Sequence, residues 1–178
     1  FVTDMNQPLG NYIGNWLEVY ESIQVLKDGK KNDLTELSLI LAGAMIYLGK
    51  KVKSLDEGIE TAIKILSSGK AFDKFAEIVK AQNGKTDFVI RPEKYPESRI
   101  KEMIKSNSSG YLSVVNTYEL GMAAIDLGAG RKTKDDMIDP KAGIIFNYKI
   151  GDTINKNVVL AEIFSDSKTG VESAKKRI

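Results

Sequence analysis

Cysteine and histidine are both absent from the 178 residues of this chain. Without cysteine there is no disulfide framework and no thiolate nucleophile, so we expect a protein of a reducing compartment, the cytoplasm. Without histidine the chain lacks the commonest general base at neutral pH and a frequent zinc ligand, which excludes hydrolase triads and ordinary zinc sites within it. Any chemistry here must use carboxylates, lysines, hydroxyl groups or backbone atoms.

Long hydrophobic runs and an excess of one charge are also missing. No apolar stretch approaches the roughly 20 residues that cross a bilayer, so we expect no membrane association. Lysine and arginine total 26 against 24 acidic residues, a net charge of +2, and this balance gives no support to nucleic-acid binding. The N-terminus has no signal-peptide pattern and does not begin with methionine, so we expect part of a longer chain.

Helical periodicity dominates the first half of the sequence. Apolar residues recur at spacings of three and four, which predicts helices over about 10–27, from Asp33, from Ser54, and over about 70–82. Two of these starts have the spacing of a capping box, Asp33 with Glu36 and Ser54 with Glu57. No strand is predicted here, so the helices lack the parallel sheet that such helices normally cover.

The second half is predicted to mix strands with helices. Two prolines in RPEKYPES break the helical pattern, and we place a domain boundary between residues 92 and 93. Alternating apolar residues predict strands at about 100–104, 111–115, 144–150 and 158–164, with a helix over 117–127 and a short helix at the end. The predicted fold class is therefore α+β, with a helical domain at 1–92 and a mixed domain at 93–178.

Two local motifs invite a functional interpretation. The glycines of 127–131 follow a helix and not a strand, so we interpret them as a helix end and turn, not as a nucleotide-binding loop. Glu21 lies in a helix whose entry, Pro8-Leu9-Gly10, can offer unpaired backbone carbonyl groups. A carboxylate with several carbonyl oxygens suits a hard cation of group one or two.

Two alternative hypotheses come from other parts of the chain. Residues 143–154 and 159–163 resemble the barrel-sandwich repeat of biotinyl and lipoyl carrier domains, but Lys168 has no flanking methionine, which the attachment lysine of carriers has. A carrier or binding module without catalytic activity is therefore the main alternative. A structural interaction fragment is the other, and it predicts exposed apolar faces on the first four helices and self-association.

The string TDMNQPLG at residues 3–10, followed by Gly14-Asn15, Leu17-Glu18-Val19 and Glu21, resembles thymidine and pyrimidine-nucleoside phosphorylases. In that family the corresponding segments read TDMNQPLG and GNALEV. The similarity continues at residues 33–37, 109–111, 127–131 with 138–139, and 149–152, so it spans nearly the whole chain. It implies the helical remainder of an α/β phosphorylase catalytic domain at 1–92 and a C-terminal α/β hammerhead domain, barrel-sandwich-like, at 93–178.

The resemblance also implies an activity. Family members are homodimeric enzymes in which phosphate attacks the anomeric carbon of a pyrimidine nucleoside, releasing the free base and a pentose 1-phosphate. The residues that bind phosphate and base in the family precede the segment matched here. We therefore assign no catalytic and no substrate-binding residue to this chain, and we expect it to be inactive alone.

A potassium ion is the cofactor that the resemblance implies. The family binds it through backbone carbonyl groups at the positions of Leu9 and Tyr12 and through the carboxylate at the position of Glu21. Tyr12 and Trp16 stand where small residues are common, and the remaining ligands lie upstream, so we expect this chain alone to bind the ion weakly. We expect Asp4, Asn6 and Gln7 to make the hydrogen bonds of a turn and not to contact substrate.

Overall fold

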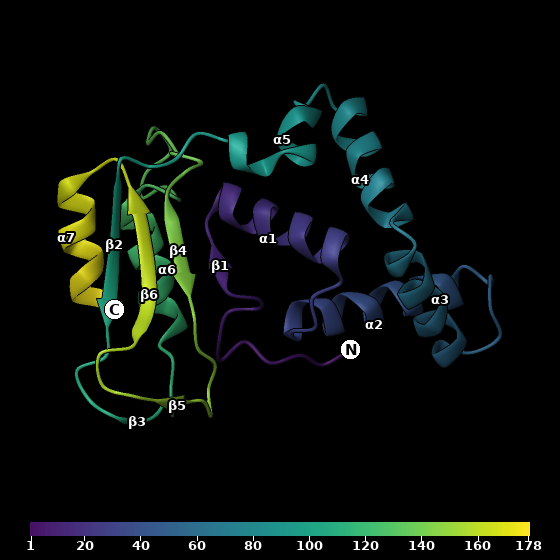
Figure 1. Ribbon diagram of the computed structural model, residues 1–178, viewed down its shortest axis with the longest axis horizontal. Helices are drawn as coiled ribbons and strands as arrows, with labels where there is room; N and C mark the ends of the chain where they lie inside the picture. The colour runs from purple at the N-terminus through teal and green to yellow at the C-terminus, as the bar shows by residue number, and fades with distance from the viewer. The chain divides into compact units, whose positions relative to one another are not determined.

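The structure is a computed structural model that describes all 178 residues (Figure 1). The chain forms two compact units, one made of Phe1–Val19 with Pro96–Ile178 and the other of Tyr20–Tyr95. The second unit is helical and the first mixes strands with helices, which confirms the α+β class. None of the helices combines the length and the apolar character that a membrane crossing requires.

The helical unit follows the predicted pattern with two short additions. These are α5 and a 3-10 helix, each of which has too few residues to display a helical period in the sequence. The helices are α1 (Asn15–Asp28), which enters from the other unit, α2 (Asp33–Leu48), α3 (Leu55–Ser67), α4 (Lys70–Ala81), α5 (Thr86–Ile90) and the short 3-10 helix Pro92–Lys94.

Side-chain caps define where α2 and α3 begin. The Ser54 hydroxyl accepts a hydrogen bond from the backbone N–H of Glu57, as predicted for α3. The prediction that Asp33 caps α2 is wrong, because the Asn32 side chain accepts from the N–H of Thr35 at 2.9 Å. Asp33 is instead the first helical residue, where its negative charge favours the positive end of the helix dipole.

A pair of glycines sets the contact between α2 and α3. A Cβ atom on Gly58 would collide with the carbonyl group of Gly43, and one on Gly43 would collide with the backbone of Ile59. The two helix backbones therefore touch at this point. This close approach explains why both helices carry a glycine, a residue that costs about 1 kcal/mol relative to alanine inside a helix.

The helical unit leaves apolar surface uncovered. Met45, Leu48 and Ile78 remain between 47% and 75% exposed. A groove of about 300 Å³ also opens among α1, α2, α3 and α4 and is lined almost wholly by apolar side chains, including Val25, Leu39 and Ile65. These surfaces agree with the exposed apolar faces expected above, and the self-association derived from them stays a prediction.

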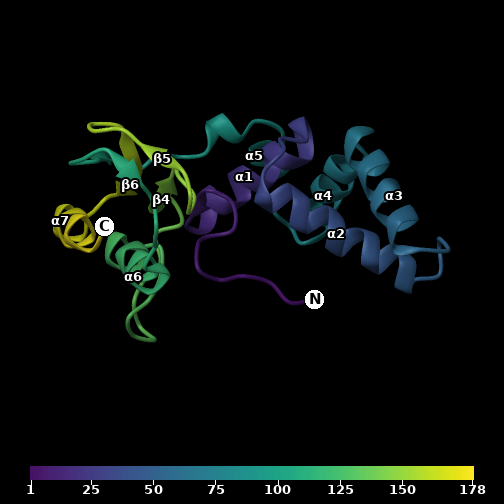
Figure 2. The same cartoon turned by 90° about the horizontal axis from the view of Figure 1, so that it is seen from below.

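The mixed unit contains an antiparallel sheet with the strand order β1-β4-β6-β2 and a separate two-stranded ladder, β3-β5. Helices α6 and α7 cover one face of the larger sheet (Figure 2). The shared core contains Leu127 of α6, Val171 of α7, Ile144 of β4 and Ile163 of β6. The bounds are β1 (Tyr12–Ile13), β2 (Ile100–Lys105), β3 (Gly110–Tyr111), α6 (Thr117–Leu127), β4 (Gly143–Phe146), β5 (Thr153–Ile154), β6 (Val159–Ser165) and α7 (Lys168–Arg177).

Two predicted strands are shorter in the structure. Strand β4 ends at Phe146 and not at residue 150, because Lys149 and Ile150 bond to the segment at residues 7–10. The predicted strand over 111–115 is limited to Gly110–Tyr111, whose partner β5 has only two residues. In both places the alternating apolar pattern continues in the sequence after the last residue that has a partner strand to pair with.

Helix α1 begins at Asn15, later than the predicted start near Gly10. Gly10 and Gly14 have φ angles of 67° and 132°, which lie outside the helical region and favour glycine. Between them, Tyr12 and Ile13 form β1 and pair with Ile145 and Ile144 of β4. The first helix is therefore preceded by an edge strand that the periodicity did not reveal.

The compact units do not follow chain order. Phe1–Val19 packs with Pro96–Ile178, whereas the predicted division at 92/93 follows the sequence and the family resemblance. The compact units describe which residues pack together, whereas the predicted limits describe segments of the sequence that correspond to family domains. The domain limits 1–92 and 93–178 therefore stay a prediction. The units do change over close to the predicted boundary, at Tyr95 and Pro96.

Candidate functional site

The three predicted cation ligands belong to different units. Leu9 lies in a turn with its side chain half exposed, and Tyr12 is in β1; both are in the mixed unit. Glu21 is on α1 in the helical unit and is only 6% exposed. The combination of these residues into one cation site stays a prediction.

The chemistry of these donors fits a monovalent cation. Two neutral carbonyl oxygens and one buried carboxylate supply hard oxygen ligands with a single negative charge. Elsewhere, the chain has no group of three or more acidic side chains that could hold a metal ion. The donor set thus depends on the backbone conformation of residues 8–12, and the contacts of that segment decide how well it is defined.

Lys149 holds the turn at residues 8–10. Its ammonium group donates hydrogen bonds to the carbonyl oxygens of Pro8 at 2.7 Å and Gly10 at 2.5 Å. The next residue, Ile150, donates its backbone N–H to the side-chain oxygen of Gln7 at 2.8 Å. Two consecutive residues after β4 therefore bond to three residues of the N-terminal segment.

Further hydrogen bonds attach the residues between this turn and the start of α1. The carbonyl group of Asn11 accepts from the N–H of Phe146 at 2.7 Å, the Asn15 side chain donates to the carbonyl of Ala129, and the N–H of Trp16 donates to the carbonyl of Pro140. These bonds and the β1-β4 pairing make residues 7–16 part of the mixed unit.

Asp4, Asn6 and Gln7 make structural hydrogen bonds, and the expectation that they do not contact substrate stays a prediction. The N–H of Asn6 donates to the Asp4 carboxylate at 3.0 Å, and Gln7 accepts from Ile150. The same segment lines an open hollow of about 500 Å³ beside the start of α6, with Met5, Leu9, Ile13, Tyr118, Leu120 and Gly121 among the other lining residues.

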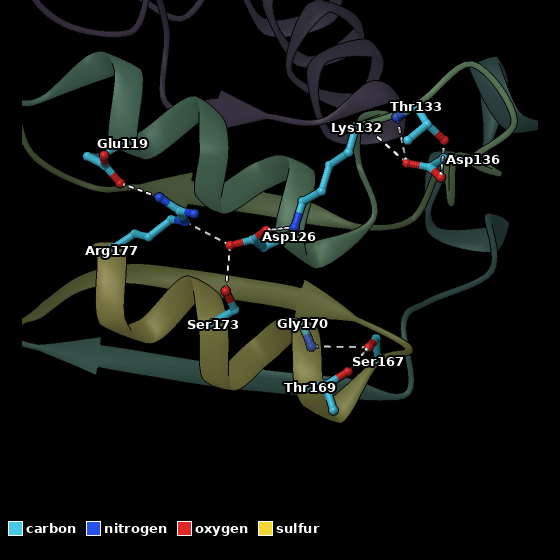
Figure 3. A network of polar contacts seen from close by, with 10 residues as sticks. All are labelled: Glu119, Asp126, Lys132, Thr133, Asp136, Ser167, Thr169, Gly170, Ser173 and Arg177. Carbon is cyan, nitrogen blue, oxygen red and sulfur yellow. Dashed lines mark hydrogen bonds and ion pairs between the residues drawn. The ribbon is translucent and has the colours of Figure 1, made fainter.

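A second polar cluster joins α6 to α7 (Figure 3). The Asp126 carboxylate is 1% exposed and accepts from Arg177 Nε at 2.7 Å and from the Ser173 hydroxyl at 2.6 Å, with the Lys132 ammonium group against its other oxygen. Lys132, Ser173 and Arg177 together hold the pKa of Asp126 far below its ordinary value. Arg177 also pairs with Glu119 at 2.6 Å, and its two acidic partners raise its pKa.

The glycine motif at residues 127–131 ends a helix, as predicted. Gly128 has a φ of 105° and donates its N–H to the carbonyl groups of Ala124 and Ile125 at the end of α6. The carbonyl of Leu127 accepts from the buried Ser165 hydroxyl at 2.6 Å. The motif therefore closes α6 and directs the chain to Lys132 and the ion cluster.

Comparison with known proteins covers most of the chain. Residues 1–72 match the family described as "Glycosyl transferase family, a/b domain", and residues 111–178 match the "Pyrimidine nucleoside phosphorylase C-terminal domain". The pyrimidine-nucleoside phosphorylase of Staphylococcus epidermidis is 40% identical over 167 residues, which cover 94% of this chain and 39% of the relative. The enzyme of the same name from Staphylococcus aureus is 39% identical over 175 residues, 98% of this chain and 40% of the relative.

The chain belongs to the pyrimidine nucleoside phosphorylase family. The resemblance based on TDMNQPLG and the later motifs is thereby confirmed. The chain spans about two fifths of the length of the curated relatives that it matches.

The carrier alternative does not fit this member of the phosphorylase family. A carrier lysine stands in a turn between two strands, but Lys168 is the first residue of α7. The preceding Ser167 caps that helix by accepting from the N–H of Gly170 at 3.1 Å. Lys168 is thus held at a helix start, without the hairpin that presents a cofactor.

Sequence reasoning missed Lys149 as part of the candidate site. In the sequence it is only the lysine of the family-like string KIGD at residues 149–152. Its contact with Pro8 joins positions 141 residues apart, and no periodicity or local motif reports such a pairing. The signal that could have found it is the charge itself, since an ammonium group that is partly buried requires oxygen partners.

Proposed function

We propose that the whole protein to which this chain contributes is a pyrimidine-nucleoside phosphorylase. In this reaction a phosphate oxygen forms a bond to the anomeric carbon while the bond from that carbon to the base nitrogen breaks. The base leaves with the electron pair and takes up a proton, and the sugar is released as a pentose 1-phosphate. The observation that carries the proposal is the 40% identity over 94% of this chain to an enzyme of that name.

Within that enzyme this chain has a supporting role. It contributes the helical remainder of the catalytic domain and a C-terminal domain of the hammerhead type, and it assembles into a homodimer as part of the whole protein. The reaction requires a cradle for the phosphate dianion and donors for the departing base. We assign those groups to other parts of the whole protein and none of them to residues 1–178.

The cation site is the functional feature that we place in this chain. Leu9 and Tyr12 would supply carbonyl oxygens to a potassium ion, and Glu21 a carboxylate oxygen. The Glu21 side chain is only 6% exposed, and its carboxylate is the kind of hard oxygen donor that such a cation prefers. The ion would order the carbonyl groups of the turn.

A phosphorolysis assay tests whether the catalytic groups lie outside this chain and whether the whole protein catalyses the proposed reaction. Thymidine and uridine are each incubated with phosphate and either this chain alone or the whole protein, and release of free base is followed. We expect no turnover by the chain alone and turnover of at least one nucleoside by the whole protein, with the Staphylococcus epidermidis enzyme as positive control. Turnover by the chain alone would contradict the proposed role, and an inactive whole protein would contradict the proposed reaction.

A further inference from the structure

Lys149 contacts the turn at residues 8–10 through two hydrogen bonds from one ammonium group. One ammonium group serves two carbonyl oxygens, those of Pro8 and Gly10, at 2.7 and 2.5 Å. Hydrogen bonds from a charged donor are stronger than neutral ones, and partial burial strengthens them further. The turn therefore carries two strong attachments to a single point on the segment that follows β4.

The peptide group between these attachments carries the Leu9 carbonyl. The carbonyl group of Pro8 belongs to the peptide bond before Leu9, and that of Gly10 to the peptide bond after Gly10. With both outer peptides held, the middle one has little freedom to rotate. This matters because Gly10 has a φ of 67° and, as a glycine, would otherwise reach many backbone conformations.

The groups around Lys149 keep its position fixed. Its own backbone N–H donates to the Asp152 carboxylate at 2.7 Å, and the neighbouring Ile150 is bonded to Gln7 at 2.8 Å. On the other side of the turn, Tyr12 is aligned by its pairing with Ile145 in the sheet. These contacts, all within the mixed unit, define the backbone of residues 7–12.

We propose that Lys149 is a positioning residue that fixes the Leu9 carbonyl for cation binding. The part of this inference that concerns the cation rests on the proposed function, whereas the hold on the turn rests on the hydrogen bonds. Lys149 does not itself bind the ion in this proposal. It prepares the turn, so that the ion meets an oxygen that is already in place and less ordering is needed upon binding.

Amide hydrogen exchange in the purified chain tests the hold on the turn. Lys149→Met keeps the length and the apolar stem but removes the charge and the donors, and Lys156→Met, at an exposed lysine of the same unit, is the matched control. We expect exchange of residues 9–12 to become roughly tenfold faster in Lys149→Met, with no change in the control, since a bond to a charged group is worth at least that factor.

The sheet provides the reference for this measurement. Amides of Ile163 and Val171 lie in the core of the mixed unit and should exchange at unchanged rates in both variants. Unchanged exchange at residues 9–12 would overturn the proposal. Equal acceleration in the turn and the core would also overturn it, because Lys149 would then be a general stabilising residue.

The link to the cation is tested in the whole protein through its thermal unfolding midpoint. Potassium chloride is titrated against choline chloride, and we expect Lys149→Met to require several-fold more potassium for half of the midpoint shift, with Lys156→Met unchanged. Equal or tighter potassium binding by Lys149→Met would overturn the inference. If the unmodified protein shows no potassium-specific shift, the proposed cation site fails, and the exchange experiment still decides whether Lys149 holds the turn.

Discussion

Asp126 shows how much one side chain can connect in this chain. Its carboxylate is buried and contacts groups from α7 and from the loop that follows α6. Such a charge is stable only while its partners remain, because removal from water is costly for an unpaired ion. The cluster therefore couples the end of α6 to the last helix of the chain.

Replacing Asp126 with asparagine should destabilise the mixed unit. Asp126→Asn keeps the shape but removes the charge that Lys132 and Arg177 contact, and we expect a loss of about 2 kcal/mol in the free energy of unfolding, since both cationic partners are partly exposed to water. Chemical denaturation monitored by circular dichroism measures this loss. Asp135→Asn, at an exposed neighbouring acid, is the control and should change stability by less than about 0.5 kcal/mol.

The same variant should change how stability depends on pH. The pKa of Asp126 is lower in the folded chain than the ordinary value of 3.8, so its contribution is fully present above that value and is lost as the pH falls below it. Unfolding midpoints of the parent chain should fall from about pH 4 downward, and those of Asp126→Asn should fall less steeply. Identical slopes would show that Asp126 is not the group responsible.

Replacing a helical glycine with alanine should change the stability in opposite directions at two positions, Gly58 and Gly121. Gly58→Ala should destabilise the helical unit by about 2 kcal/mol or more, because the new Cβ would collide with the carbonyl group of Gly43 on α2. Gly121→Ala in α6 should instead stabilise by about 0.5–1 kcal/mol, since nothing lies within 4 Å of its added Cβ.

Denaturant unfolding of the two glycine variants makes the comparison direct. The substitution and the type of secondary structure are the same, so helix propensity contributes with the same sign in both. Only the neighbouring backbone differs. A stabilised Gly58→Ala would mean that α2 and α3 separate easily, and that their contact is not the feature that requires glycine.

The elements that the sequence predicted are those with a complete local signal. Ser54 followed by Glu57 identified the start of α3, and the spacing of Phe72, Phe75 and Val79 identified α4. Prediction failed where the deciding partner is remote in sequence. Strand β4 ends where Lys149 turns to the N-terminal segment, and β1 exists because β4 lies beside it.

The candidate site could likewise be predicted only where the sequence carries a local or a family signal. The family resemblance predicts cation ligands at Leu9, Tyr12 and Glu21, and the turn at Pro8-Leu9-Gly10 predicts a cage of carbonyl oxygens. Lys149 came only from the structure, because its contacts with Pro8 and Gly10 cross the whole helical unit in sequence. Family membership indicates the candidate ligands, and the fold shows that Lys149 bonds to the turn that contains one of them, Leu9.

At the scale of the whole molecule, the mixed unit is assembled from two separate stretches of chain. Phe1–Val19 reaches its partners through the β1-β4 ladder, the Lys149 contacts and the bonds at Asn15 and Trp16, all of them to residues beyond Pro96. The 76 residues of Tyr20–Tyr95 connect the two stretches covalently but take part in none of these contacts.

A cut in the helical unit should therefore leave the mixed unit associated. A protease site introduced between residues 29 and 31, in the loop before α2, would separate β1 and α1 from the rest of the chain. We expect the short N-terminal piece to remain bound after cleavage in native buffer and to be released in denaturant, as measured by size-exclusion chromatography. Release in native buffer would mean that the hydrogen bonds of residues 7–16 are too weak to act without the connecting chain.

The discontinuity also bears on how the protein is made. During synthesis the ribosome releases residues 1–19 long before β4 and β6 emerge, so the first strand has no partner while the helices form. Completion of the mixed unit must wait until β4 and β6 have been synthesised, and Lys149, which lies between these two strands in the sequence, is among the residues needed to complete it. Early termination beyond residue 140 should thus leave residues 1–19 without their partner strands and expose them to proteolytic quality control.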